Sequence, residues 1–225
     1  MEGLYLYAVL PAATPPPAPV RGLEGEEVRL AAAGPLSLWC SALAGPPPAT
    51  VERARRHHAV VAAAFAAGDT PLPLRYGQWV EDARALERWG QERGAALGER
   101  LAQVAGTAEF GIRVARGSAR PPEAARIAST PGKAHMERLA ARFAAREGGE
   151  EGCLALERLR AALGDLVRDE RVDPPGERAG LLAVAHLVPR EAQDEYRARV
   201  RDVRERVPDL RFLVTGPWPP YSFSE

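Results

Sequence analysis

The alternation of apolar and polar residues predicts strands at the start of the chain. Residues 3–10 are apolar on both faces, which is typical of a central strand that is buried on both sides. Two short apolar runs, residues 27–33 and 36–42, are separated by Gly34-Pro35 and predict a hairpin. Residues 71–77 are also apolar, but their two prolines favour an edge strand or an extended connection.

Helical spacing follows in two stretches of the N-terminal half. Between Thr50, a good N-cap, and Gly68, a good residue to follow a helix, apolar residues recur every three or four positions. Residues 79–104 share this spacing and predict one long helix, or two helices broken near the glycines of residues 90–98. Each interior glycine costs about 1 kcal/mol relative to alanine, so we expect a kink or another closely packed element there. Residues 107–114 alternate and predict a half-exposed strand.

The second half of the chain alternates predicted helices and strands. Helices are expected at residues 134–146, 153–167 and 191–207, and strands at residues 181–188 and 210–214. The last strand, helix and strand have short joints, so they predict a right-handed crossover between parallel strands. Asp173-Pro174-Pro175-Gly176 predicts a turn.

This order of elements predicts an α+β fold, because helices and strands mix without the regular repeat of a doubly wound sheet. Residues 118–132 contain prolines and show no clear period, so they are the expected linker. We therefore predict an N-terminal α+β domain over residues 1–117. A C-terminal α+β domain over residues 133–225 carries long helices and a tail rich in aromatic residues and proline.

Composition and charge exclude some classes of partner. Hydrophobic residues make up 46% and charged residues 27% of the chain, and 30 Lys and Arg balance 30 Asp and Glu. This balance argues against nucleic-acid binding by bulk charge and against binding a lipid membrane through a basic face. The uncharged residues 30–51 are interrupted by Gly-Pro pairs, and no secretory signal is expected, so we predict a cytoplasmic protein.

Motifs for catalysis or metal binding are missing from the sequence. Adjacent His57 and His58 would point about 100° apart on a helix and lack other ligands at suitable spacing, so we expect one partly buried and one exposed histidine. Gly132-Lys133 resembles part of a phosphate loop, but Ile127 and Ala134 stand where that loop needs Gly and Ser or Thr. We therefore predict no catalytic residue, no metal and no cofactor.

Three other residues of chemical interest have structural interpretations. Cys40 and Cys153 lie far apart and are expected to be buried small hydrophobic residues. Apolar neighbours should raise the pKa of the Cys40 thiol. His186 lies in an apolar run, where a hydrogen-bonded core histidine is more common than a catalyst.

The C-terminal tail is the most distinctive stretch. The strand at residues 210–214 is expected to stop at Gly216-Pro217, and prolines then hold the backbone extended. Disordered tails are usually poor in aromatic residues, so we expect the side chains of Trp218, Tyr221 and Phe223 to dock. Two interpretations stay open. The tail packs on the protein's own core, which we favour, or Trp218 and Tyr221 anchor a partner.

Four segments resemble the GvpL/GvpF family of gas vesicle proteins. Thr215-Gly216-Pro217-Trp218-Pro219-Pro220-Tyr221-Ser222-Phe223 looks like the C-terminal signature of that family. Residues 4–9 resemble its opening strand, and residues 71–77 resemble its central LPLRFG element, with Tyr76 where Phe is usual. Residues 183–188 resemble its late AFLV strand, with His186 in place of the aromatic residue.

The resemblance implies a fold, a function and partners. It implies an N-terminal domain of modified ferredoxin-like type, followed by a helix-rich C-terminal domain. The implied function is that of a non-enzymatic accessory or minor structural protein, associated with the gas vesicle and active in its assembly. The implied partners are the major hydrophobic shell protein and other gas vesicle accessory proteins. The family motifs single out, for structure or interaction, Tyr7, Leu74, Arg75, Tyr76, Gly77, Thr215, Gly216, Pro217, Trp218, Pro219, Pro220 and Tyr221.

Two other functions stay open from the residues alone. One is a small cytosolic enzyme on an α+β scaffold, with Arg75, His58 or His186 in its site. The other is a general dimerisation module built on the helix of residues 79–104. Self-association is also possible for a gas vesicle accessory protein.

Overall fold

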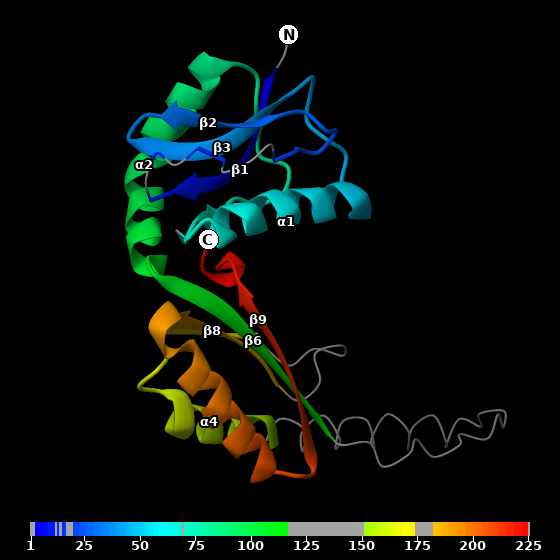
Figure 1. The fold of residues 1–225 in the computed structure, drawn as a ribbon, viewed down its shortest axis with the longest axis vertical. Coiled ribbons are helices and arrows are strands. Elements are labelled where there is room, and N and C mark those ends of the chain that lie inside the picture. The colour runs from blue at the N-terminus through cyan, green and yellow to red at the C-terminus, as the bar shows by residue number, and fades with distance from the viewer. Residues whose placement is uncertain are drawn as a thin grey trace, which may run out of the picture. The chain divides into compact units, whose positions relative to one another are not determined.

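A computed structural model describes residues 3–11, 13, 15–16, 20–68, 70–116, 151–173 and 182–224 (Figure 1). The chain divides into two compact units. The first unit contains Met1–Glu109 and Gly216–Glu225, and the second unit contains Phe110–Thr215. Each unit has its own sheet with helices packed beside it, which confirms the predicted α+β class. The expected ferredoxin-like type of the N-terminal domain stays a prediction.

The first sheet is built around strand β1 (Gly3–Leu10), in which all eight residues are buried. On one side β1 pairs antiparallel with β3 (Leu36–Leu43), and β3 pairs in turn with β2 (Val28–Ala33). On the other side β1 pairs with two short strands, β4 (Leu72–Pro73) and β5 (Trp79–Val80). The predicted central strand, hairpin and proline-containing edge segment are therefore confirmed.

Helix α1 (Val51–Ala66) covers the tyrosine-bearing face of β1. Its N-cap is the predicted Thr50, whose side chain accepts a hydrogen bond from the backbone N–H of Arg53. Its inward residues Val60, Val61 and Ala64 pack with Tyr5 and Tyr7 in one core cluster. Helix α1 therefore fixes which side chains meet this face of the sheet.

Helix α2 (Ala83–Val104) is a single helix, with Asp82 as its N-cap. It starts later than predicted, because Trp79 and Val80 pair with β1 instead. The close packing expected at its glycines is present, since Cβ atoms added at Gly90 and Gly94 would lie 2.2 Å from Ala33 O and 2.7 Å from Pro35. The turn between β2 and β3 is thus packed directly onto the helix backbone.

The second sheet contains, in spatial order, β7 (Asp169–Asp173), β8 (Leu182–Pro189), β6 (Thr107–Arg116) and β9 (Leu210–Trp218). Buried residues alternate along β6, as predicted. Strands β8 and β9 flank β6 in an antiparallel sheet and are therefore parallel to each other, with helix α4 (Gln193–Glu205) between them in the chain. A short 3-10 turn, η1 (Arg190–Ala192), precedes α4. A second one, η2 (Tyr221–Phe223), follows β9.

The structure corrects three expectations for the second half of the chain. Strand β9 does not stop at Gly216-Pro217 but continues to Trp218, because a strand at the edge of a sheet tolerates proline. The charged strand β7 was not predicted, and the helix over residues 151–163 ends before residue 167. Cys153 is exposed rather than buried, because Ala155 and Leu159 form the inward face of that helix.

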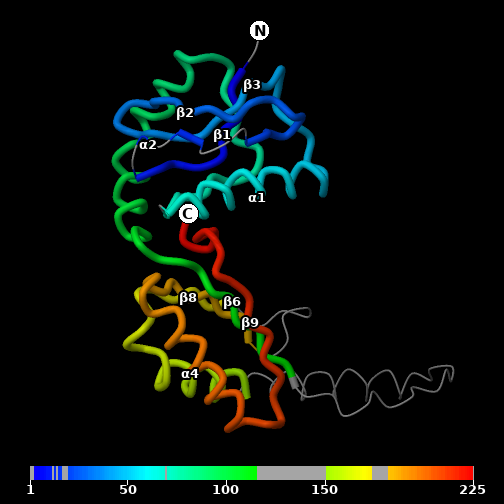
Figure 2. The backbone as a smooth tube through the Cα atoms, in the orientation of Figure 1, coloured from blue at the N-terminus to red at the C-terminus, as the bar shows by residue number. Residues whose placement is uncertain are grey.

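The tail differs from its expected place in the C-terminal domain. Residues Gly216–Glu225 belong to the first unit, and the backbone trace shows η2 beside α1 (Figure 2). The predicted linker at residues 118–132, the helix at residues 134–146 and most of the turn at residues 173–176 lie outside the described residues. None of the helices in the described part of the chain is long and apolar enough to cross a membrane.

Candidate functional site

Two of the predicted family-motif tyrosines meet in the core of the first unit around one histidine. Tyr5 and Tyr7 come from the same face of β1, His57 comes from α1, and Tyr76 follows β4. The ring centroid of His57 lies 5.7 Å from that of Tyr5, 5.5 Å from Tyr7 and 5.9 Å from Tyr76. We call these four residues the tyrosine–histidine cluster.

The hydrogen bonds of His57 define its protonation. Its Nε2 lies 3.0 Å from the carbonyl oxygen of Leu74, which can only accept, so Nε2 carries the proton. Its Nδ1 then accepts from the Tyr5 hydroxyl at 2.9 Å, and the backbone N–H of Gly77 donates to the same hydroxyl at 3.0 Å. Burial lowers the pKa of His57 to about 4 and raises the pKa of Tyr5, so both are neutral near pH 7.

Tyr7 connects the tyrosine–histidine cluster to the loop before β2. Its hydroxyl lies 2.9 Å from Ser41 Oγ and accepts from the backbone N–H of Leu23 at 3.1 Å. Ser41 Oγ in turn donates to Glu26 Oε1 at 2.7 Å. Partial burial opposes ionisation of Glu26, but the hydrogen bonds from Ser41 and from backbone N–H groups hold its pKa below the usual value.

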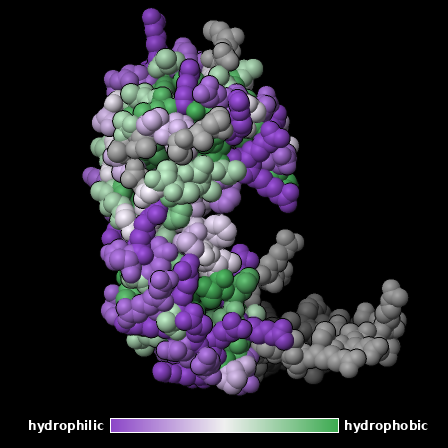
Figure 3. Space-filling view, in the orientation of Figure 1, coloured by the Kyte–Doolittle hydropathy of each residue, from purple (hydrophilic) through white to green (hydrophobic). Residues whose placement is uncertain are grey.

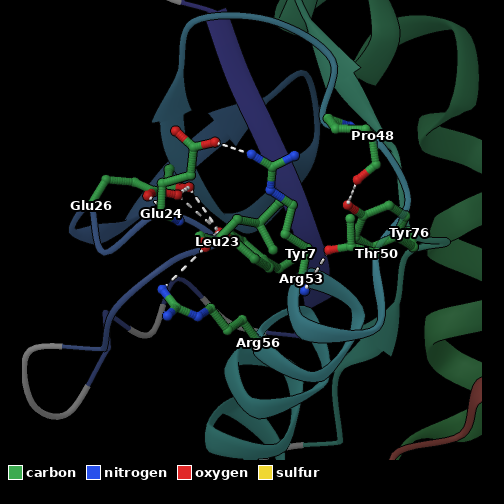
Figure 4. Close-up of polar contacts among 10 residues, drawn as sticks. Tyr7, Leu23, Glu24, Glu26, Pro48, Thr50, Arg53, Arg56 and Tyr76 are labelled. Atoms are coloured by element: carbon green, nitrogen blue, oxygen red, sulfur yellow. Dashed lines mark hydrogen bonds and ion pairs between the residues drawn. The ribbon is translucent and has the colours of Figure 1, made fainter.

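The same loop is tied to the first turns of α1 (Figure 4). Arg53 pairs with Glu24, and Arg56 donates to the carbonyl oxygen of Leu23 at 3.3 Å. On the other side of the helix start, the Tyr76 hydroxyl donates to the carbonyl oxygen of Pro48 at 2.8 Å. Every polar group of the cluster therefore has a partner, and its role in the structure is to join β1, α1 and two loops.

The tail forms a second group of contacts on α1, centred on His58. The Tyr221 hydroxyl lies 3.1 Å from His58 Nδ1, and the Trp218 ring meets the His58 ring edge to face at a centroid distance of 5.8 Å. Ser222 donates to the Glu109 carboxylate through both its backbone N–H, at 2.8 Å, and its hydroxyl, at 2.7 Å. These contacts hold the tail on both α1 and β6.

Burial along the tail is uneven. Pro219, Pro220 and Phe223 are buried, whereas Trp218 keeps 43% of its surface exposed. Burial raises the pKa of Tyr221, which therefore stays neutral as a hydrogen-bonding group. The tail thus packs against its own protein while leaving one large aromatic side chain accessible.

The predicted motif residues do not form one site. Tyr7 and Tyr76 contribute side chains to the tyrosine–histidine cluster, and Leu74 and Gly77 contribute backbone groups, whereas the side chain of Arg75 is exposed. The remaining motif residues lie on β9 or in the tail, and are Thr215, Gly216, Pro217, Trp218, Pro219, Pro220 and Tyr221. Sequence reasoning missed Glu26, Ser41 and Glu109, because a single polar residue in or just before a strand carries no signal of its partner.

The second unit contains a separate buried network around His186. The Glu170 carboxylate accepts from His186 Nε2 at 3.1 Å, so Nδ1 accepts from the Tyr196 hydroxyl at 2.8 Å. Arg160 donates twice to Glu170, at 2.6 and 2.9 Å. Burial lowers the pKa of His186 although Glu170 opposes the shift, so the histidine is a neutral, hydrogen-bonded core residue as expected. Among the described residues, no group of three or more His, Cys, Asp and Glu could hold a metal ion.

Comparison with known proteins identifies the family. A family model described as gas vesicle synthesis protein GvpL/GvpF matches residues 3–225. The chain belongs to the GvpL/GvpF family. Gas vesicle protein F2 of Halobacterium salinarum is 28% identical over 156 residues, which are 68% of this chain and 58% of that relative's length. The GvpL/GvpF resemblance seen in the sequence motifs is therefore confirmed.

Solved structures of GvpF proteins share the fold. The crystal structure of GvpF from Anabaena sp. PCC7120 matches with a TM-score of 0.81 and 20% identity, over 100% of this chain and 97% of that one. GvpF from Microcystis aeruginosa matches with a TM-score of 0.77 and 20% identity, over 99% of both chains. The α+β fold of both units is thus common to this GvpL/GvpF chain and to those GvpF structures.

Proposed function

We propose that this GvpL/GvpF protein is an accessory or minor structural protein that takes part in gas vesicle assembly. It acts without catalysis, in the cytoplasm, by binding the hydrophobic shell protein and other accessory proteins at the vesicle. The observation that carries the proposal is the match of the family model to residues 3–225, which include both units.

The exposed indole of Trp218 is the proposed contact for the shell protein. Contacts of Tyr221 with His58 and of Ser222 with Glu109 fix the tail, so Trp218 is held in place at little further cost in conformational entropy. Tryptophan is enriched among residues that dominate binding energy at interfaces. An accessible, positioned tryptophan suits the capture of a hydrophobic subunit before it joins the vesicle wall.

Co-purification with the shell protein of the same organism tests this proposal. Trp218→Ala should remove most of the captured shell protein, because truncating an interface tryptophan commonly costs about 2 kcal/mol or more. Leu213→Ala is the matched control, since Leu213 is also a large exposed apolar residue but belongs to the second unit. If the wild-type chain captures no shell protein, and does not change its solubility, the proposed function is wrong.

The geometry gives little support to the two other functions. In the enzyme interpretation, Arg75 is a surface residue, while His58 and His186 already have hydrogen-bonding partners. In the dimerisation interpretation, the Gly90 and Gly94 face of α2 is already covered by Ala33 and Pro35. Neither interpretation is therefore proposed for this chain.

A further inference from the structure

A cationic groove lies in the second unit, where α4 ends and β9 begins. It has a volume of about 720 Å³. Arg201 and Arg204 line it from α4, and Arg211 lines it from β9. The apolar part of its lining comes from Pro208, Leu210 and Phe212.

The local structure explains why these side chains meet. Arg201 and Arg204 are three positions apart and so share one face of α4, while Val200 and Val203 are buried on the inward side. The chain then turns within a few residues, and the backbone N–H of Leu210 donates to the carbonyl oxygen of Val207 at 3.0 Å. This short turn brings Arg211 back beside the last turn of the helix.

The three groove arginines differ from the other arginines of α4. Arg197 pairs with Asp194, and Arg199 pairs with both Asp165 and Glu195. Within the part of the chain that the structure describes, Arg201, Arg204 and Arg211 have no ion-pair partner. The surface over α4 is correspondingly hydrophilic in the space-filling view (Figure 3).

The charge in the groove is unbalanced, although the whole chain has no net charge. Glu205 is the one carboxylate among the lining residues, which include three arginines. Cations near a helix C-terminus stabilise the helix dipole, which accounts for Arg204. That effect does not account for Arg211, which lies on a strand, or for the partly buried apolar surface between the arginines.

We propose that this groove binds an acidic segment of a partner protein that also carries apolar side chains. Carboxylates of the segment pair with Arg201, Arg204 and Arg211, because a guanidinium group presents two parallel donors to a carboxylate. An apolar side chain of the segment packs against Pro208 and Leu210. The site belongs to the other unit from Trp218 and does not depend on the contact proposed there.

A protein segment fits the groove better than a nucleic acid. Phe212 is the one aromatic residue in the lining and is buried, so no aromatic ring there is free to stack on a base. An acidic segment that alternates with apolar residues satisfies both the charge and the apolar lining.

Fluorescence anisotropy with the full chain tests this proposal. The probe is a short labelled peptide in which Glu alternates with Leu, and its counterpart has Gln in place of every Glu. The acidic peptide should bind more tightly than its counterpart, and the binding should weaken as salt is added, since salt screens exposed charges. Arg201→Glu combined with Arg204→Glu should weaken binding about tenfold or more.

A matched variant separates the groove from general charge effects. Arg201→Glu alone should already weaken binding. Arg113→Glu makes the same charge change as that single substitution, at an exposed position of β6 outside the groove lining, and should leave binding unchanged. The proposal is overturned if the two peptides bind equally, or if Arg113→Glu weakens binding as much as a groove variant. It is also overturned if single-stranded DNA binds more tightly than the acidic peptide, or if the chain binds a second copy of itself through these arginines.

Discussion

The hydroxyl of Tyr221 lies 3.1 Å from Nδ1 of His58, although the two residues are 163 positions apart in the chain. This hydrogen bond fixes the end of the chain on α1, beside the edge-to-face contact of Trp218 with the same imidazole ring. His57, the preceding residue, instead forms hydrogen bonds with Tyr5 and Leu74 in the core. One helix turn therefore connects both the central strand and the tail of this GvpL/GvpF protein.

Tyr221→Phe should destabilise the first unit by about 1 kcal/mol, the usual net contribution of a hydrogen bond that is partly buried. Urea unfolding measures the loss, and faster hydrogen exchange of the α1 amides assigns it to the first unit. Tyr76→Phe is the control, because its hydroxyl bond to Pro48 is exposed and water can replace it. Equal stability of Tyr221→Phe and the wild type would show that the tail is held by its other contacts.

Two glycines of α2 should respond in opposite ways to the same substitution. Gly98→Ala should stabilise the protein by about 1 kcal/mol, because alanine is the better helix former and nothing lies within 4 Å of the added methyl group. Gly90→Ala should instead destabilise it by about 1–3 kcal/mol, since the added Cβ would lie 2.2 Å from Ala33 O and force the hairpin away. Thermal unfolding of the two variants measures both effects. Stabilisation by Gly90→Ala would contradict the close approach.

The sequence predicts those elements whose pattern is complete within a short stretch. Strand β1 is recognisable because it is apolar on both faces, and α1 is recognisable from Thr50, Gly68 and the spacing between them. Strand β7 is not recognisable, because four of its five residues are charged and most of them are exposed. The contact of its residue Glu170 with His186 joins residues whose pairing is set by the sheet.

The candidate site shows the same limit. The motif residues Tyr7, Tyr76 and Tyr221 could be singled out from the sequence. The sequence does not show that Tyr7 and Tyr76 both contact His57, or that Tyr221 contacts His58 instead. That division depends on the rotation of α1 about its axis, which is set by how Val60 and Val61 pack on β1. The polar partners Ser41 and Glu109 follow from that packing and have no local signature.

Buried His57 should make the protein less stable in mild acid. Its pKa is about 4 in the folded protein and near 6.5 in the unfolded chain, so between these values only the unfolded chain takes up the proton. Stability is therefore complete above pH 6.5 and falls as the pH decreases towards 4. Between pH 7.5 and 5 the loss from His57 should be about 2 kcal/mol.

The pH dependence of urea unfolding, measured from pH 7.5 to 5, checks this expectation. His57→Gln should lower stability at pH 7.5, because it disturbs the bonds to Tyr5 and Leu74, but should flatten the fall towards pH 5. A smaller dependence of the unfolding free energy on pH should remain, since burial also lowers the pKa of His186. His58→Gln keeps His57 in place and should retain the full slope. If the slope of His57→Gln equals that of the wild type, the proton taken up on unfolding belongs to another group.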